Sequence, residues 1–154
     1  MWKEGKMWTK TSSKTAIALI VCLVATLSGL PTISTAGTLT GASGSSSQWG
    51  SGWIDLAPAV DFKKGDRLKL LIGGTANKIL VRLLPKGQSP DTSVGLVGGP
   101  VDVPKSRVVE VELTQDRKQV IQISVHGGPN PWGKFLLGHD NGPASLESAE
   151  LIEP

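Results

Sequence analysis

The chain has 154 residues, with 16 Lys and Arg against 13 Asp and Glu. Four of the bases and one of the acids precede Gly37, so 12 of each remain from Gly37 onward and that part is formally neutral. A nucleic-acid-binding surface needs clustered positive charge, so nucleic acid is not an expected partner.

The first 36 residues have the pattern of a secretory signal peptide. Lysines at positions 3, 6, 10 and 14 form a basic segment, Ala16 to Leu27 form an apolar segment, and Ser34-Thr35-Ala36 before Gly37 is a small-x-small cleavage site. The apolar run is shorter than the ~20 residues that a membrane-spanning helix needs, which favours cleavage over a retained anchor. We therefore expect a secreted or periplasmic protein that meets a membrane only through this segment, before cleavage.

Cys22 is the only cysteine, and it lies inside the apolar run. A lipoprotein site would place it behind a small residue at the end of that run, but Val21 precedes it and apolar residues follow. No lipid anchor is expected. The processed chain then has no cysteine, and an exported domain without disulfides fits a bacterial protein better than a small animal module.

Gly37 to Gly52 is rich in Gly, Ser and Thr, which predicts a flexible leader before a folded domain at 53–154. The domain is punctuated by Gly, Pro and Asp at short intervals, and runs of Val, Ile and Leu between them predict strands. The expected strands are 51–56, 60–62, 67–72, 78–84, 94–97, 108–113, 119–126, 134–137 and 144–152.

The clearest of these strands lie between Val108 and His126. The first run alternates as Val-Val-Glu-Val-Glu-Leu, a polar segment 114–118 follows, and the second run alternates as far as His126. Successive side chains of a strand point to opposite faces. We predict an antiparallel hairpin with Glu110, Ser124 and His126 facing water. The residues predicted to face the core are Val109, Val111, Leu113, Ile121, Ile123 and Val125.

No segment has a convincing helical period with caps. Residues 145–151 allow a helical alternative, but their alternation and final position favour a strand. Many short strands with regular turns predict an all-β protein, an antiparallel two-sheet β-sandwich of jelly-roll-like form.

Trp132 is the most informative aromatic residue, because it lies in an irregular Gly/Pro-rich loop, 127–133. It is either a lid packed over the end of the sandwich or an exposed stacking platform. Trp53 is expected to pack in the core, and Trp49 is left unassigned. Aromatic faces beside imidazole, amide and carboxylate groups are typical of sugar recognition. The candidate ligand-binding residues are Trp132, His126, Asn130, His139, Asp140 and Asn141.

The run Gln122-Ile-Ser-Val-His-Gly-Gly-Pro, with Asn141-Gly-Pro-Ala-Ser-Leu-Glu-Ser-Ala-Glu-Leu-Ile152 at the end, resembles the C-terminal part of bacterial carbohydrate-binding, galactose-binding-like jelly-roll modules. The resemblance covers roughly the last 35 residues. It implies a non-catalytic module that binds a polysaccharide through loops at one end of the sandwich, and it assigns no individual binding residue.

Catalytic motifs are missing from the sequence. The processed chain has no cysteine nucleophile, Gly-x-Ser-x-Gly elbow, phosphate-binding loop or His-Glu-x-x-His pair. We expect no enzyme, cofactor or metal, although Asp140-Asn141-Gly142 leaves calcium open. Two functions of different class remain: a carbohydrate-binding module, and a structural or protein-interaction sandwich whose partner is an envelope protein. A small hydrolase is a distant third.

Overall fold

The computed structural model describes residues 36–89, 95–128 and 131–154, with the side chains of Pro131 and Trp132 excepted. They belong to one compact unit, Ser34–Pro154. The expected signal peptide, apart from Ala36, lies outside the described residues.

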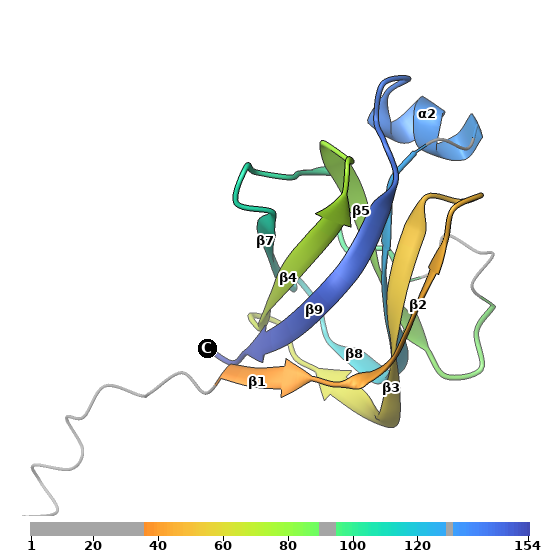
Figure 1. The fold of residues 1–154 in the computed structure, drawn as a ribbon. Coiled ribbons are helices and arrows are strands. Elements are labelled where there is room, and N and C mark those ends of the chain that lie inside the picture. Colours follow the sequence, from red (N-terminus) through yellow and green to blue (C-terminus); the bar gives the residue numbers. More distant parts are fainter. Residues whose placement is uncertain (1–35, 90–94, 129–130) are drawn as a thin grey trace, which may run out of the picture. The chain divides into compact units, whose positions relative to one another are not determined.

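The described chain forms two antiparallel sheets and one short helix (Figure 1). The four-stranded sheet has the order β1-β9-β4-β7, and the five-stranded sheet has the order β2-β3-β8-β5-β6. The bounds are β1 Ala36–Leu39, β2 Gly41–Ser46, β3 Ser51–Phe62, β4 Arg67–Gly74, β5 Lys78–Pro85, β6 Val101–Asp102, β7 Val108–Glu112, β8 Arg117–His126, α2 Pro131–Leu137 and β9 Ala144–Ile152. The prediction of an all-β, two-sheet sandwich is confirmed.

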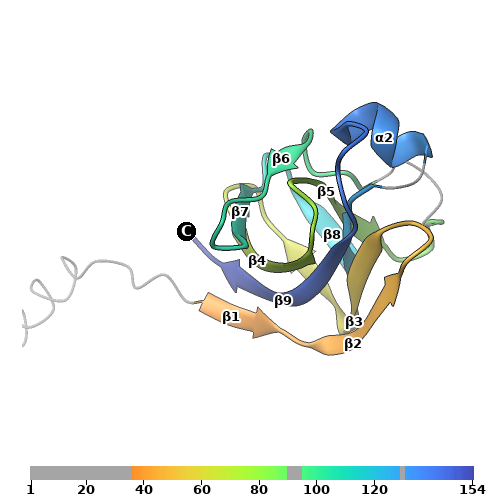
Figure 2. The same cartoon turned by 45° about the horizontal axis from the view of Figure 1, so that its top comes forward.

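The connections make this sandwich a jelly roll. From β3 to β5, and again from β6 to β9, each strand passes to the opposite sheet. Without β2, the two sheets have four strands each, as in two interlocked Greek keys. β2 is an additional edge strand beside β3. Figure 2 shows the two layers facing each other, with α2 beyond one end.

The predicted hairpin between Val108 and His126 is wrong in its pairing, although both strands exist. β7 pairs with β4, whereas β8 pairs with β3 and β5 in the other sheet. Alternation in sequence shows which face of each strand is apolar, but two apolar faces can meet across a core as well as side by side. Here Val109 and Val111 of β7 approach the core from one sheet, and Ile123 and Val125 of β8 approach it from the other.

The segment expected to be a flexible leader contains β1 and β2. β1 pairs with β9, and β2 pairs with the first half of β3 through six residue pairs. Composition did not reveal these strands, because Gly, Ala and Ser add little side-chain packing. Backbone hydrogen bonds to an existing sheet edge hold them instead.

Other predicted strands differ from the structure, and the predicted strands 51–56 and 60–62 are parts of the one strand β3. Residues 134–137 belong to α2, where the Pro at the first helical position fits the fixed φ of proline. Of 94–97, position 94 lies outside the described residues, and Leu96 forms a single bridge to Arg82. The predicted strand 144–152 is confirmed as β9.

The core lies between the sheets and is almost entirely aliphatic. Phe62 is its aromatic member among the described residues, and the row Val111, Leu68, Leu151 continues across three strands. Ile121 has no partner in either ladder of β8, so it forms a bulge and Val120 takes the inward position.

The outer faces of the two sheets differ in character. The four-stranded sheet faces solvent with ion pairs, Arg67 to Glu110 at 3.5 Å and Lys69 to Glu150 at 3.4 Å. On the five-stranded sheet, Ser124 of β8 was expected to face water but is buried, and the outward residues of β5 are buried as well. Leu80, Leu84, Arg82 and Ser124 are all less than 9% exposed. The outer face of the five-stranded sheet therefore contains buried polar side chains, those of Arg82 and Ser124.

Candidate functional site

A row of four paired residues crosses the outer face of the five-stranded sheet. Trp53 of β3 lies opposite Gly44 of β2 and Ser124 of β8, and Ser124 lies opposite Arg82 of β5. Directly paired residues project to the same face of a sheet. Because the next residue along β3, β8 and β5 belongs to the core, the row faces outward. The prediction that Trp53 packs in the core is therefore wrong, and its neighbour Ile54 takes that place.

The Trp53 indole lies against the backbone of Gly44. A Cβ atom at position 44 would lie 2.5 Å from Cε2 and Cζ2 of the indole and 2.7 Å from Nε1. Any larger residue would displace the ring, so the glycine makes room for a close aromatic contact. The Trp53 residue is only partly buried. The indole therefore packs on the backbone of β2, and part of the Trp53 residue stays accessible to solvent.

Polar groups flank this ring along β3. Two residues away, the Asp55 carboxylate accepts a hydrogen bond from Gln122 Nε2 at 2.8 Å, and this pair is exposed. Two residues away in the other direction, Ser51 lies opposite His126. An amide and a carboxylate that fix each other beside an aromatic ring provide both a stacking surface and directed hydrogen-bonding groups.

A buried polar network continues the row toward β5. Arg82 Nε donates to Ser124 Oγ at 3.3 Å, and that oxygen lies 3.0 Å from His126 Nε2. A guanidinium can only donate, so Ser124 Oγ accepts from Arg82, and the same hydroxyl also forms the hydrogen bond with the imidazole. Burial, and secondly the charge of Arg82, lower the pKa of His126 from 6.5 to about 4. The imidazole is therefore neutral at physiological pH.

This arrangement resembles a nucleophile and its base but does not suit acyl transfer. A serine hydroxyl beside an imidazole nitrogen is the usual geometry for activation. Ser124 is 1% exposed, however, so a substrate carbonyl cannot reach its Oγ. A base with a pKa near 4 is also poorly matched to proton transfer at neutral pH. The network instead joins β5 and β8 beside Trp53, on the same face of the sheet.

The structure describes the side chains of four of the six residues expected to bind ligand: His126, His139, Asp140 and Asn141. His126 belongs to the buried network, while His139 and Asp140 are exposed in the turn between α2 and β9. Trp132 lies in α2 with its side chain outside the described residues, and Asn130 is wholly outside them.

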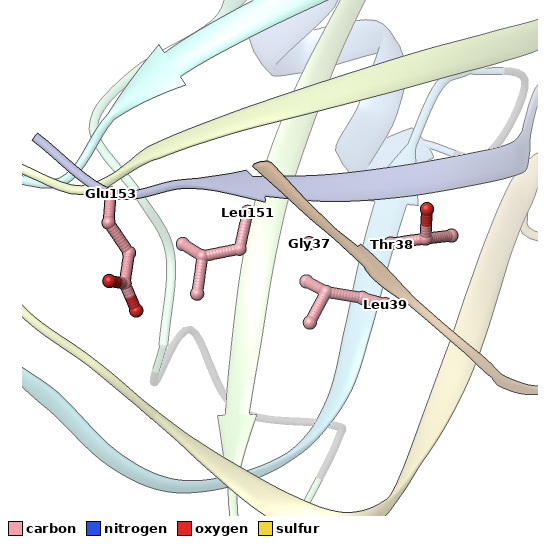
Figure 3. Close-up of a pocket in the computed structure, with 5 residues that line it drawn as sticks. All are labelled: Gly37, Thr38, Leu39, Leu151 and Glu153. Atoms are coloured by element: carbon pink, nitrogen blue, oxygen red, sulfur yellow. The ribbon is translucent and has the colours of Figure 1, made fainter. Parts of the chain in front are cut away.

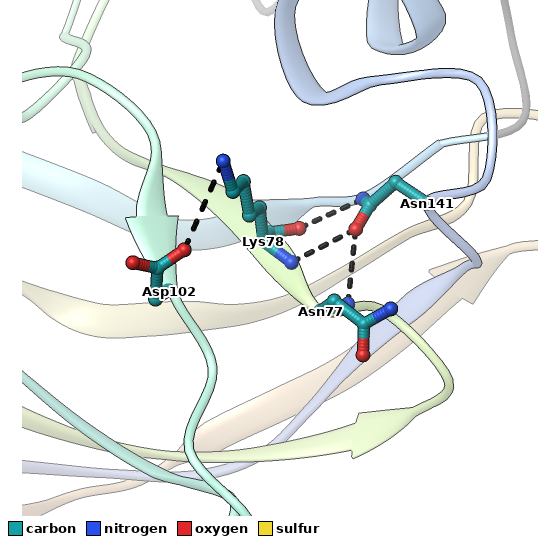
Figure 4. Close-up of polar contacts among 4 residues, drawn as sticks. All are labelled: Asn77, Lys78, Asp102 and Asn141. Carbon is teal, nitrogen blue, oxygen red and sulfur yellow. Dashed lines mark hydrogen bonds and ion pairs between the residues drawn. The ribbon is translucent and has the colours of Figure 1, made fainter.

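The Asn141 side chain is hydrogen-bonded to the backbone of a segment distant in sequence (Figure 4). Its Oδ1 accepts from the backbone N–H of Asn77 at 2.9 Å and of Lys78 at 2.8 Å, and its Nδ2 donates to the Lys78 carbonyl at 2.8 Å. The residue is 7% exposed. Its amide joins the turn before β9 to the start of β5. Lys78 Nζ also lies 4.0 Å from Asp102 of β6.

The loops that follow β8 and α2 meet at one end of the sandwich. The backbone N–H of Gly128 donates to the Gly142 carbonyl at 3.0 Å. The Gly50 carbonyl, in the turn between β2 and β3, accepts from Gly127 at 2.8 Å and from Ala144 at 3.1 Å. Three segments distant in sequence are thus joined by backbone hydrogen bonds.

Exposed apolar side chains gather on elements at this end. Trp49, in the turn between β2 and β3, is 54% exposed, and Phe135 and Leu136 of α2 are 86% and 37% exposed. Figure 2 shows α2 at the same end as that turn, in agreement with Figure 1.

A separate hollow of about 250 Å³ opens beside β1, lined by Gly37, Thr38, Leu39, Leu151 and Glu153 (Figure 3). Gly37 pairs with Leu151, which pairs with Leu68 of the core, so position 37 faces the interior. The hollow is the unfilled end of this apolar row, because Gly37 has no side chain to occupy it.

Sequence reasoning missed Trp53 as a surface residue and Arg82 as a buried one. Arg82 stands alone within the apolar run 79–84. An almost continuous apolar run is typical of a strand buried on both faces, and that signal could have identified Arg82 as a buried charge. The position of Trp53 had no such signal, because it depends on which strand presents a glycine to it.

Among the described residues, no three His, Cys, Asp or Glu side chains are grouped closely enough to hold a metal ion. Within the same part of the chain, no helix has the length and apolarity needed to cross a membrane. Comparison with family models, characterised proteins and solved structures gives no match.

Proposed function

We propose that this protein is an exported, non-catalytic binding module for carbohydrate, and that Trp53 is the centre of its binding surface. The observation that carries the proposal is the contact of the Trp53 indole with Gly44, beside the exposed Asp55–Gln122 pair. A pyranose presents C–H groups to an aromatic face and hydroxyls to amide and carboxylate groups. The surface offers these complementary groups at neighbouring positions of one sheet.

The sequence supports the exported location. The basic and apolar segments before Gly37 have the order of a signal peptide. The absence of cysteine after Cys22 fits a bacterial secreted or periplasmic protein. In that compartment, polysaccharides of the cell surface or of the surroundings are within reach of the module.

Affinity electrophoresis of the exported protein in gels containing different polysaccharides tests this function. We expect at least one polysaccharide to retard the protein and Trp53→Ala to remove the retardation. Leu71→Ala is the matched control, because Leu71 is 40% exposed on the outer face of the other sheet. Circular dichroism establishes that both variants are folded. Failure of every polysaccharide to retard the protein, or retardation of Trp53→Ala equal to that of the parent, rejects the proposal.

A second candidate is a structural or protein-interaction sandwich of the bacterial envelope. The exposure of Phe135 and Leu136 favours it, because adjacent aromatic and aliphatic side chains suit a protein interface better than a sugar. Photo-crosslinking from position 135 in the exporting cell tests this function, with position 71 as control. Adducts of discrete mass from position 135 alone support an envelope partner, and their absence removes this candidate.

A further inference from the structure

Outward positions continue along β3 toward the end of the sandwich. Asp55, Trp53 and Ser51 alternate with residues directed at the core. Beyond them, the Trp49 N–H donates to Ser46 Oγ at 3.4 Å, and Ser46 is the direct partner of Ser51. The backbone of Trp49 is therefore hydrogen-bonded to the end of β2 that pairs with Ser51, two residues from Trp53 along β3.

Both tryptophans have accessible surface, and the side chains of the adjoining strand β2 are small. Trp49 is 54% exposed and Trp53 is partly buried. Their Cα atoms are separated by at most about 13 Å, which is four steps of a strand. The adjoining strand β2 reads Gly-Ala-Ser-Gly-Ser-Ser, so it provides no large side chain that would separate the two indoles.

Charge on this surface is low. In the three rows of paired residues that contain Asp55, Trp53 and Ser51, the exposed charged group is the Asp55 carboxylate. His126 is neutral above its pKa of about 4. An anionic polymer would meet an unfavourable carboxylate here, whereas a neutral one would not.

We propose that the ligand is a neutral, unbranched polysaccharide segment that extends along β3 and contacts Trp53 and Trp49 together. This inference rests on the proposed function and specifies its substrate class. One sugar ring covers one indole, so a single terminal sugar would engage only Trp53. A chain several rings long engages both indoles, and the second contact strengthens binding without a second cost of immobilising a separate molecule.

Isothermal titration of the exported protein against oligosaccharides of increasing length tests the inference. The probes are cello-, xylo- and manno-oligosaccharides from monomer to hexamer, with oligogalacturonides as anionic counterparts. For the sugar that binds, we expect the hexamer to bind about tenfold more tightly than the monomer, from one additional aromatic contact. Trp49→Ala should return the hexamer affinity to that of the monomer. Trp53→Ala should abolish binding of both, whereas Trp53→Phe should retain part of it and Leu71→Ala all of it.

The outcomes separate this inference from the function on which it rests. Equal affinities for monomer and hexamer, with binding still lost in Trp53→Ala, would overturn the extended ligand and leave the carbohydrate function intact. Preference for oligogalacturonides would overturn the neutral class alone. Absence of binding to every probe, in a protein that also passes unretarded through all polysaccharide gels, would overturn both.

Discussion

Replacement of Asn141 by alanine should weaken the fold and leave ligand affinity unchanged. The side chain makes three hydrogen bonds to the backbone of Asn77 and Lys78, between 2.8 and 2.9 Å long, and it is buried. At roughly 1 kcal/mol net for each bond, their loss lowers the free energy of unfolding by about 3 kcal/mol. In a domain of about 120 residues, this corresponds to a fall in Tm of about 12 °C.

Urea and thermal unfolding followed by circular dichroism measure this change. Asn141→Asp should also destabilise the fold, because it keeps the acceptor for the two backbone N–H groups but sets a second carboxylate oxygen against the Lys78 carbonyl, where Nδ2 now donates. Exposed neighbours are the controls, and His139→Ala and Asp140→Ala should change stability by less than about 0.5 kcal/mol. A normal unfolding free energy in Asn141→Ala, combined with reduced polysaccharide binding, would refute the structural role.

Four further predictions concern other parts of the molecule. Gly44→Val should displace the Trp53 indole, because a Cβ there lies 2.5 Å from the ring, and titration should show at least about a tenfold loss of affinity. The pKa of His126 is about 4 when folded and 6.5 when unfolded. The unfolded state therefore binds the proton more readily, and up to about 3 kcal/mol of stability, present above pH 6.5, should be lost as pH falls toward 4. Arg107 donates to the carbonyls of residues 72, 73, 74 and 76 at 2.8 to 3.0 Å, so Arg107→Lys should lower the unfolding free energy by about 2–4 kcal/mol at constant charge. Gly37→Val should partly fill the hollow beside β1 and raise the unfolding free energy by about 1 kcal/mol.

Matched variants and opposite results check these four. Gly99→Val repeats the glycine replacement where a Cβ meets open space, and it should affect neither affinity nor stability. His126→Asn should flatten the acid part of the stability curve, and persistence of the full slope would assign it to other groups. Equal stability of Arg107→Lys and the parent would contradict a stabilising role of the hydrogen bonds from Arg107 to the end of β4 and the turn after it. A destabilised Gly37→Val would contradict an open hollow.

The location of the candidate site follows from a difference between the two sheets. The outer face of the four-stranded sheet alternates Arg and Lys with Glu, and such exposed pairs contribute little to stability. The five-stranded sheet instead carries Arg82, Ser124 and His126 in a hydrogen-bonded group. Since a buried polar group must keep its partners, this network favours one register of β5 and β8, on the strands beside Trp53.

Strand alternation predicted much of the core. Val109, Val111 and Leu113 are buried as expected, and so are Ile123 and Val125. The alternation of β8 fails before Gln122, because Ile121 is a bulge, and a bulge depends on how neighbouring strands align. Helix α2 was missed because seven residues between Gly and Pro carry too little helical periodicity to be distinguished from a strand.

The candidate site was only partly accessible to prediction. The loops after β8 and α2 do meet, and His126 does lie near an aromatic surface, but the described aromatic residue there is Trp53 from another strand. Its setting needs Gly44 of β2 on one side and Ser124 of β8 on the other. Gly44 is brought to Trp53 by the turn between β2 and β3, but Ser124 is far from both in the chain, so its proximity is a property of the topology.

By itself, the amino-acid sequence determined the fold class, the apolar faces of most strands and the charge balance of the chain after Gly37. These depend on local periodicity and composition, which a single segment contains in full. Only the tertiary structure decided that β7 and β8 lie in opposite sheets, that the Gly/Ser-rich segment supplies two strands, and that Asn141 is structural. Each of these depends on which distant backbone lies alongside, and hydrogen bonds between distant strands leave little trace in the identity of the residues that form them.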